Sequence, residues 1–213
     1  MKIEQTTILS TAYFPPLQYF SKIVSNNRIV IESFENFSKQ SYRNRCEILS
    51  ANGKQTLTVP IEKALSSKQL IKDVKIDYRN NWQDIHLKSL QAAYLSSPFY
   101  EYYIDALIPF FEKKHKFLFD YNLLIIETLQ NEIQINKKIN FSKQYNANYN
   151  FPDFRNSIHP KRKFQIQDNN FNNIEYTQVF SEKHGFIKNL SILDLLFNEG
   201  PNTLNLLTKM YSK

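Results

Sequence analysis

Glycine, cysteine and long apolar runs are all scarce in this chain of 213 residues, and each scarcity excludes a class of protein. The 3 glycines form no GxGxxG or GxxxxGK(S/T) pattern, so the usual nucleotide-binding loops are absent. The 1 cysteine excludes an internal disulfide and fits a reducing compartment. No run of about 18 apolar residues is present. Residues 1–5 show no apolar leader, so we expect a cytoplasmic protein without a membrane span.

Aromatic and basic residues are abundant instead. Hydrophobic residues make up 42% of the chain and aromatic residues 15%, which suffices for one sizeable core, so we expect a single domain over residues 1–213. The net charge of +7 comes from scattered residues such as those at 113–114, 137–138 and 161–163, without zinc-finger spacing or an RNP-type motif. We interpret this charge as a solvated basic surface and predict no nucleic-acid binding, while small anionic ligands remain open.

The first part of the chain predicts a βαβ unit. Residues 6–12 are apolar and lead into an aromatic-proline cluster, which indicates a buried strand. Residues 17–25 carry apolar side chains at helical spacing, and Pro16 suits a helix start because its missing N–H needs no partner there. Residues 28–32 indicate the next strand, which such a connection makes parallel to the first.

Asn52-Gly53 is the strongest local signal, because it stands between two alternating runs and is typical of a type I′ hairpin turn. That turn requires a positive φ at both residues. Pairing of Ala51 with Lys54 then sets the register of the two strands.

The same register assigns faces to the residues before the turn. Cys46 falls on the apolar face opposite Val59, so we expect a buried and nearly unreactive thiol rather than a nucleophile. Arg43 and Arg45 fall on the other face, where they could form a fork for phosphate or carboxylate. The alternative for the two arginines is an ordinary solvated face.

The second half of the chain is predicted to be mostly helical. The expected elements, in chain order, are a strand within 70–77, a helix from Trp82 to Tyr94, a helix capped by Ser97 with Pro98 first and Pro109 kinking or splitting it, a helix over about 120–135, loops with one or two short strands over 136–175, and a final helix from Ser191 to Gly200. The fold class is therefore α/β, with a mixed sheet, an N-terminal βαβ unit and a β-hairpin, followed by a mostly helical second half.

Two clusters do not resemble fold-building sequence and are the candidate small-molecule site. One is the aromatic-proline segment near residue 14, and the other combines arginines, amides and a tyrosine just before the hairpin. A third segment, 153–161, is polar without helical periodicity, as binding loops are. The predicted ligand-binding residues are Tyr13, Pro15, Tyr19, Gln40, Tyr42, Arg43, Asn44, Arg45, Arg155 and His159.

Two histidines are candidate proton acceptors. His86 shares a helix face with Trp82 and Leu90, where a packed, hydrogen-bonded histidine is the alternative. His184 stands in a predicted loop before the last helix. The 4 histidines of the chain form no HxxxH or HxH pattern, so no metal site is predicted. No GxSxG or SxxK motif indicates an enzyme class either.

Several strings resemble the WbqC-like family in their order along the chain, over about residues 7–201. They are Tyr13–Pro16 with Tyr19-Phe20, Gln40–Arg45, Asn52-Gly53 with Leu57–Pro60, Trp82 with His86, Ser96–Tyr103, and Asn189–Pro201. This bacterial family occurs with polysaccharide and O-antigen biosynthesis genes. The resemblance implies a transferase that moves an acyl or aminoacyl group, such as glycine, onto a sugar.

The chain also departs from the family pattern. Many members carry a histidine and a proline ahead of Tyr-Phe-Pro, and here Ser10 and Ala12 stand at about those places. The leading hypothesis is a transferase in cell-surface polysaccharide biosynthesis that takes a sugar or anionic donor. The alternative is a non-catalytic ligand-binding or scaffold protein with an aromatic- and arginine-lined cleft, which the departure favours. The sequence identifies neither a cofactor nor an oligomeric state.

Overall fold

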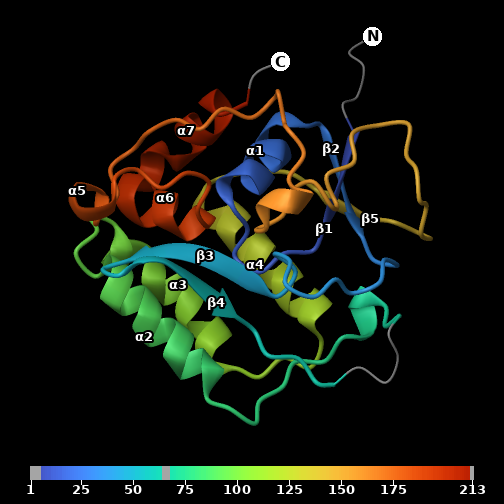
Figure 1. The fold of residues 1–213 in the computed structure, drawn as a ribbon, viewed down its shortest axis with the longest axis horizontal. Helices are drawn as coiled ribbons and strands as arrows, with labels where there is room; N and C mark the ends of the chain where they lie inside the picture. Colours follow the sequence, from blue (N-terminus) through green and yellow to red (C-terminus); the bar gives the residue numbers. More distant parts are fainter. Residues whose placement is uncertain (1–5, 64–67, 212–213) are drawn as a thin grey trace.

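A parallel sheet lies beside a β-hairpin and several helices in the computed structural model, which describes residues 6–63 and 68–211 (Figure 1). The sheet has the order β1-β2-β5, from Thr6–Ser10, Arg28–Glu32 and Ile139–Phe141. Both pairings are parallel, with Ile8 opposite Val30. The predicted βαβ unit is confirmed, and β5 extends it from far along the chain.

Helix α1, Leu17–Ser25, connects β1 to β2 and is buried over most of its length. Pro16 is the residue just before it, with a φ of −70° that suits a helix start. The C-terminal helices α6, Ile192–Glu199, and α7, Thr203–Lys209, pack against α1. This contact joins the two ends of the chain around one helix.

The hairpin consists of β3, Arg45–Ser50, and β4, Gly53–Thr58. Its register pairs Ser50 with Gly53 and Leu49 with Lys54. The predicted pairing of Ala51 with Lys54 is therefore wrong, because the partner of Lys54 lies two residues earlier in the chain. An even shift leaves every side chain on its predicted face, because strand faces alternate with a period of two. Cys46 is accordingly buried, opposite Leu57 rather than Val59.

The turn geometry also differs from the prediction. Gly53 has a φ of 95°, whereas Asn52 is not among the residues with a positive φ. A type I turn followed by a left-handed glycine explains this pattern, since it needs the positive φ at the glycine alone. The predicted type I′ turn is therefore wrong, although the hairpin itself is confirmed.

Helices α2, Trp82–Tyr94, and α3, Tyr100–Glu112, lie below the hairpin in Figure 1, and α4, Leu118–Glu132, crosses the middle of the view and packs against α3. Helix α3 starts after Phe99, so the predicted N-cap at Ser97 is wrong. Pro109 lies inside α3 and does not split it, since the helix continues to Glu112.

The remaining segments are mostly irregular. Residues 70–77 form a 3-10 turn, η1 Ile71–Asp73, and isolated bridges rather than the predicted strand. The loops of 136–175 contain β5 and η2, Arg162–Phe164, and are followed by α5, Ser181–His184, and later by η3, Gly200–Asn202. Ser191 caps α6 as predicted, accepting a hydrogen bond from the Leu193 amide.

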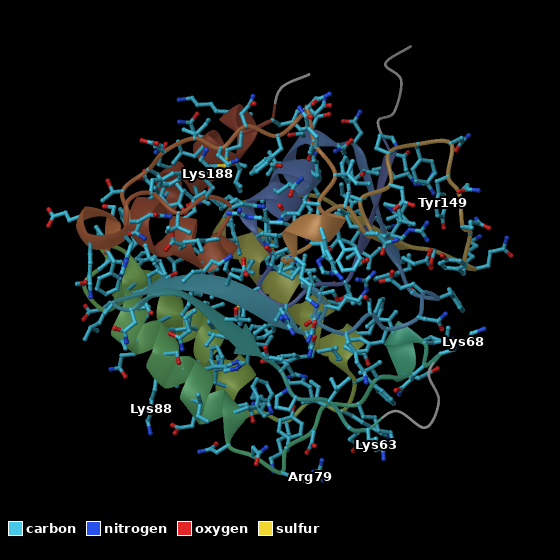
Figure 2. All side chains as sticks on the ribbon, in the orientation of Figure 1. Lys63, Lys68, Arg79, Lys88, Tyr149 and Lys188 are labelled. Atoms are coloured by element: carbon cyan, nitrogen blue, oxygen red, sulfur yellow. The ribbon has the colours of Figure 1, made fainter. Side chains whose placement is uncertain are left out.

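Charged side chains are spread over the periphery, among them Lys63, Arg79 and Lys88 (Figure 2). Within the described residues, no helix combines the length and apolarity needed to cross a bilayer. Residues 1–5, which show no apolar leader, lie outside the described part of the chain.

Candidate functional site

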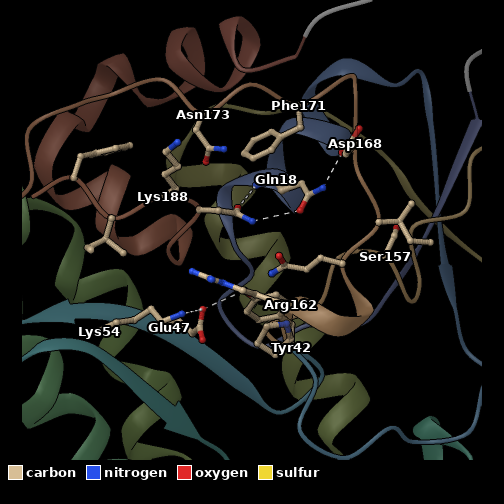
Figure 3. Close-up of a pocket in the computed structure, with 16 residues that line it drawn as sticks. Gln18, Tyr42, Glu47, Lys54, Ser157, Arg162, Asp168, Phe171, Asn173 and Lys188 are labelled. Atoms are coloured by element: carbon tan, nitrogen blue, oxygen red, sulfur yellow. Dashed lines mark hydrogen bonds and ion pairs between the residues drawn. The ribbon is translucent and has the colours of Figure 1, made fainter.

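A pocket of about 630 Å³ lies between the first turn of α1, the β3–β4 hairpin and the loops that follow β5 and α5 (Figure 3). Its lining consists of Gln18, Tyr42, Glu47, Lys54, Ser157, Pro160, Arg162, Gln165, Ile166, Asp168, Phe171, Asn173, Phe186, Ile187, Lys188 and Asn189. A volume of this size accommodates a ligand of drug or sugar size. The mixed lining suits a ligand that has both polar groups and apolar faces.

Two cations of the pocket have no counter-ion in the part of the chain that the structure describes. Arg162 comes from η2 and Lys188 from the loop after α5, and Figure 3 shows them on different walls. Neither forms an ion pair with any residue in the ranges 6–63 and 68–211.

Each of the two carboxylates of the lining has a cationic partner within the protein. Asp168 lies 2.7 Å from Lys22, and Glu47 lies 3.0 Å from Lys54. The cations described above therefore leave an excess of positive charge in the pocket, which attracts an anionic group.

Lys22 anchors one wall of the pocket to α1. Its side chain is fully buried, with the ammonium 4.8 Å from the Phe154 ring and 5.0 Å from the Tyr211 ring. Burial lowers the pKa of Lys22, while the Asp168 carboxylate acts in the opposite direction. Gln18 donates to the same carboxylate at 2.8 Å. These contacts hold the loop around Asp168 against α1.

Asn189 closes the end of α1 that faces the pocket. It has a φ of 54°, a left-handed conformation that asparagine tolerates better than most residues. Its side-chain oxygen accepts the Gln18 amide at 2.9 Å, and the Leu17 amide donates to the Leu190 carbonyl at 3.0 Å. The first amides of α1 are thus already bonded within the protein.

Aromatic rings supply the apolar surfaces of the pocket. Phe171 and Phe186 are half-buried in its lining, and Tyr42 is almost fully buried. The Tyr42 hydroxyl donates to Glu47 at 3.3 Å. Burial raises the pKa of Tyr42, so this hydroxyl keeps its proton.

Of the predicted ligand-binding residues, only Tyr42 belongs to this lining. Its neighbour Arg43 lies in the protein interior. Arg43 is 3% exposed, and its guanidinium donates to both carboxylate oxygens of Glu35 at 2.8 and 2.5 Å. It also donates to the Ser10 hydroxyl at 2.7 Å. The expectation of an outward strand face is wrong for Arg43, because β3 begins only at Arg45 and a buried carboxylate attracts the guanidinium.

Arg155 occupies a similar position. It is buried, donates to Asp153 at 3.0 Å and to the fully buried Glu32 at 3.1 Å. The rings of Tyr145 and Tyr149 stand 5.2 and 5.0 Å from its guanidinium. Both arginines therefore form buried ion pairs near the carboxyl ends of β1 and β2.

Several of the predicted residues do meet in a narrow crevice next to Ser10, at the end of β1. Tyr19, Tyr42, Arg43 and Arg155 line it, and its volume of about 10 Å³ admits no more than a single water. The Tyr19 hydroxyl donates to the Ser10 carbonyl at 2.8 Å. Pairing of the aromatic-proline loop with the arginine segment is thus observed, but without room for a substrate.

The other predicted binding residues are dispersed around the pocket rather than within it. Asn44 donates to the Val59 carbonyl at 2.9 Å, and Gln40 accepts from Lys161 on the exposed surface. Pro15 is buried, and its carbonyl accepts from the first amide of α6 at 2.8 Å. Arg45 is half-buried, and its Nε lacks an acceptor among the described residues.

His159 is buried beside the pocket without lining it. Its Nδ1 accepts from the Lys161 amide at 3.0 Å, so the ring is neutral with its proton on Nε2. Burial lowers the pKa of His159, and the positive charges of Arg43 and Lys161 lower it further.

His86 lies in the core instead of the pocket. Its Nδ1 is 2.9 Å from the hydroxyl of the fully buried Tyr13. Burial lowers the pKa of His86 to about 4, partly offset by a hydrogen bond to the Thr58 backbone. Burial also raises the pKa of Tyr13.

His184 lies far along the hairpin from His86. Its ring forms a hydrogen bond of 3.0 Å with the carbonyl of Ala51 in the hairpin turn, whereas His86 lies beside Thr58, where β4 ends. The two predicted bases are therefore not brought together.

None of the five charged residues of the lining was predicted from the sequence, namely Glu47, Lys54, Arg162, Asp168 and Lys188. Alternation places Glu47 on the polar face of β3, which was the available signal. Arg162 directly follows the predicted binding segment 153–161, so the segment ended one residue too early. Among the described residues, no three His, Cys, Asp or Glu side chains gather as they would around a metal ion.

These features define an α/β protein with a polar, cation-bearing pocket where helix α1, the hairpin and the C-terminal loops meet. The WbqC-like protein family model matches residues 11–156 and 148–206, and the chain belongs to that family. It is 23% identical over 223 residues to Uncharacterized protein Rv1507c of Mycobacterium tuberculosis (strain ATCC 25618 / H37Rv), covering 93% of this chain and 95% of the relative. No solved structure matches the chain significantly.

Proposed function

We propose that the protein is a transferase of cell-surface polysaccharide biosynthesis that binds an anionic sugar in the pocket of Figure 3. The single observation that carries this proposal is the pair of cations, Arg162 and Lys188, which have no counter-ions among the described residues and lie in a cavity of about 630 Å³. Guanidinium and ammonium groups bind phosphate and carboxylate by charged hydrogen bonds.

The remaining lining supports a sugar as the body of the ligand. Asn173, Gln165 and Ser157 offer amide and hydroxyl groups that pair with sugar hydroxyls. Phe171 and Phe186 offer apolar surfaces for the carbon–hydrogen face of a sugar ring. The resemblance to the WbqC-like family supports acyl or aminoacyl transfer, such as that of glycine, as the reaction.

A non-catalytic ligand-binding role is the second candidate, and one observation favours it. Neither predicted base, His86 nor His184, lines the pocket, and both pocket carboxylates are already paired. The assignment of these histidines as proton acceptors thus remains a prediction. A transfer reaction needs a base near the acceptor, whereas simple binding does not.

Substitution of the two cations tests the binding proposal. We expect Arg162→Gln and Lys188→Gln each to weaken the affinity for glucose 6-phosphate about tenfold, the usual value of a charged hydrogen bond. Isothermal titration calorimetry measures the change. Lys163→Gln is the matched control, since Lys163 neighbours Arg162 but contacts the Phe164 ring outside the lining. Equal affinity in all three variants would remove the pocket as the binding site.

Product analysis separates the two candidates. The protein is incubated with a sugar phosphate and an activated acyl or glycyl ester, and mass spectrometry follows the mass of the sugar. Acylation that depends on the protein and is lost with Arg162→Gln supports a transferase. Binding without any mass change supports the ligand-binding alternative.

A further inference from the structure

Glu47 uses only one of its two carboxylate oxygens within the protein. Oε2 accepts from the Tyr42 hydroxyl at 3.3 Å and from the Lys54 ammonium at 3.0 Å. Oε1 accepts no hydrogen bond from any residue of the described ranges 6–63 and 68–211. Figure 3 shows the carboxylate in the pocket wall between these two neighbours.

The Glu47 side chain is 12% exposed, and Oε1 is not among the enclosed side-chain atoms that lack a partner in the described residues, so this oxygen is accessible from the pocket. A carboxylate oxygen that is accessible and has no donor within the protein can accept a hydrogen bond from a ligand. Asp168, the other carboxylate of the lining, differs: its two oxygens accept from Lys22, Gln18 and the Asn170 amide. Glu47 Oε1 is thus the one carboxylate oxygen in the described lining that a ligand can satisfy.

We propose that Glu47 selects the ligand by accepting a hydrogen bond from an amino group, so the substrate is an amino sugar that also carries an anionic group. This inference rests on the proposed sugar-binding function. The pocket presents charge of both signs, with Lys188 across the cavity from Glu47 in Figure 3. An ammonium group at Oε1 and a phosphate or carboxylate at the cations would complement both.

An amino group fits Oε1 better than a hydroxyl group does. A charged donor forms a stronger hydrogen bond to a carboxylate than a neutral one. Lys54, the existing cationic partner, is 46% exposed, and exposed ion pairs contribute little. A free amino acid carries the same two charges, but it would fill only a small part of a cavity of about 630 Å³.

Two probes that differ only at one position test the inference: glucosamine 6-phosphate and glucose 6-phosphate. We expect calorimetry to show that the protein binds the amino sugar about tenfold more tightly. Glu47→Gln should abolish this preference, so that the variant binds the two sugars with affinities within about twofold of each other. Glu62→Gln is the matched control, because Glu62 lines a different cavity, and it should retain the preference. Circular dichroism confirms that each variant is folded.

The outcomes separate this inference from the function on which it rests. Equal binding of the two sugars, or a preference that survives in Glu47→Gln, overturns the role of Glu47 and leaves the sugar pocket intact. Failure of both sugars to bind overturns the proposed function, and the inference with it. Glycine is the third probe: tight, Glu47-dependent binding of glycine without any sugar preference assigns the oxygen to an amino acid and overturns the amino-sugar assignment.

Discussion

Arg43 and Arg45 stand two positions apart in the chain, yet their surroundings differ. Arg43 is enclosed with Glu35 in an ion pair at 2.5 Å, whereas Arg45 has no ion-pair partner among the described residues. The same residue type therefore contributes to stability at one position and is free for another role at the other.

Substitution separates these two roles. Arg43→Gln should lower the free energy of unfolding by about 3–5 kcal/mol, because it leaves the buried Glu35 carboxylate without its partner. Arg45→Gln should change it by less than about 1 kcal/mol, since it removes a guanidinium whose Nε has no acceptor. Urea denaturation followed by circular dichroism measures both values. Similar losses in the two variants would contradict the difference in their surroundings.

At the scale of elements, the hairpin turn shows which residue determines its conformation. A Cβ added at Gly53 would have only an ordinary contact with His184 at 3.8 Å, so space is not the constraint. The φ of 95° is the constraint, because residues with a side chain adopt it at a cost.

We therefore expect Gly53→Ala to destabilise the protein by about 1 kcal/mol. Asn52→Ala should be nearly neutral, since Asn52 does not have a positive φ. Thermal unfolding of both variants provides the test. A comparable loss at Asn52 would restore the type I′ turn.

Periodicity explains which elements could be predicted from the sequence. Helix α1, β2, the hairpin and α2 have apolar side chains at regular spacing, and regular spacing reports burial of one face. The site could be predicted only in part. Tyr42 was found, but Arg162 and Lys188 come from irregular loops, and no local pattern reveals that such loops meet across a cavity. Arg43 is buried because it pairs with the buried Glu35 carboxylate. The alternation of side chains along a strand does not reveal a partner that comes from another segment.

At the scale of the molecule, two buried groups give opposite responses to pH. Burial raises the pKa of Asp194 to about 6, despite hydrogen bonds from Tyr94 at 2.9 Å, Tyr176 at 2.6 Å and Gln178 at 2.9 Å. The folded state thus takes up this proton before the unfolded state does. From about pH 4 to pH 6, Asp194 lowers the free energy of unfolding as pH rises, by up to about 3 kcal/mol.

His86 has the opposite effect. Its pKa of about 4 lies below the ordinary value of 6.5, so the unfolded state takes up the proton first. Its contribution is present above about pH 6.5 and is lost as pH falls toward 4, again by about 3 kcal/mol. The two residues offset each other between these pH values.

Asp194→Asn should expose the His86 response. Between pH 6 and pH 4 we expect the variant to lose about 3 kcal/mol more of its free energy of unfolding than the parent protein does. Urea denaturation at both pH values measures the difference. An unchanged pH response in Asp194→Asn would show that Asp194 does not take up a proton in this range.

The bond between Lys22 and Asp168 joins residues 146 positions apart. Closing so long a stretch of chain costs entropy that is recovered only when both ends pack, so such contacts form late in folding. A nascent chain that has not yet reached Asp168 already contains β1, β2 and the hairpin, but it lacks a wall of the pocket. The ability to bind a ligand therefore comes only with the nearly complete chain, and a bound ligand favours the finished fold over every partly folded one.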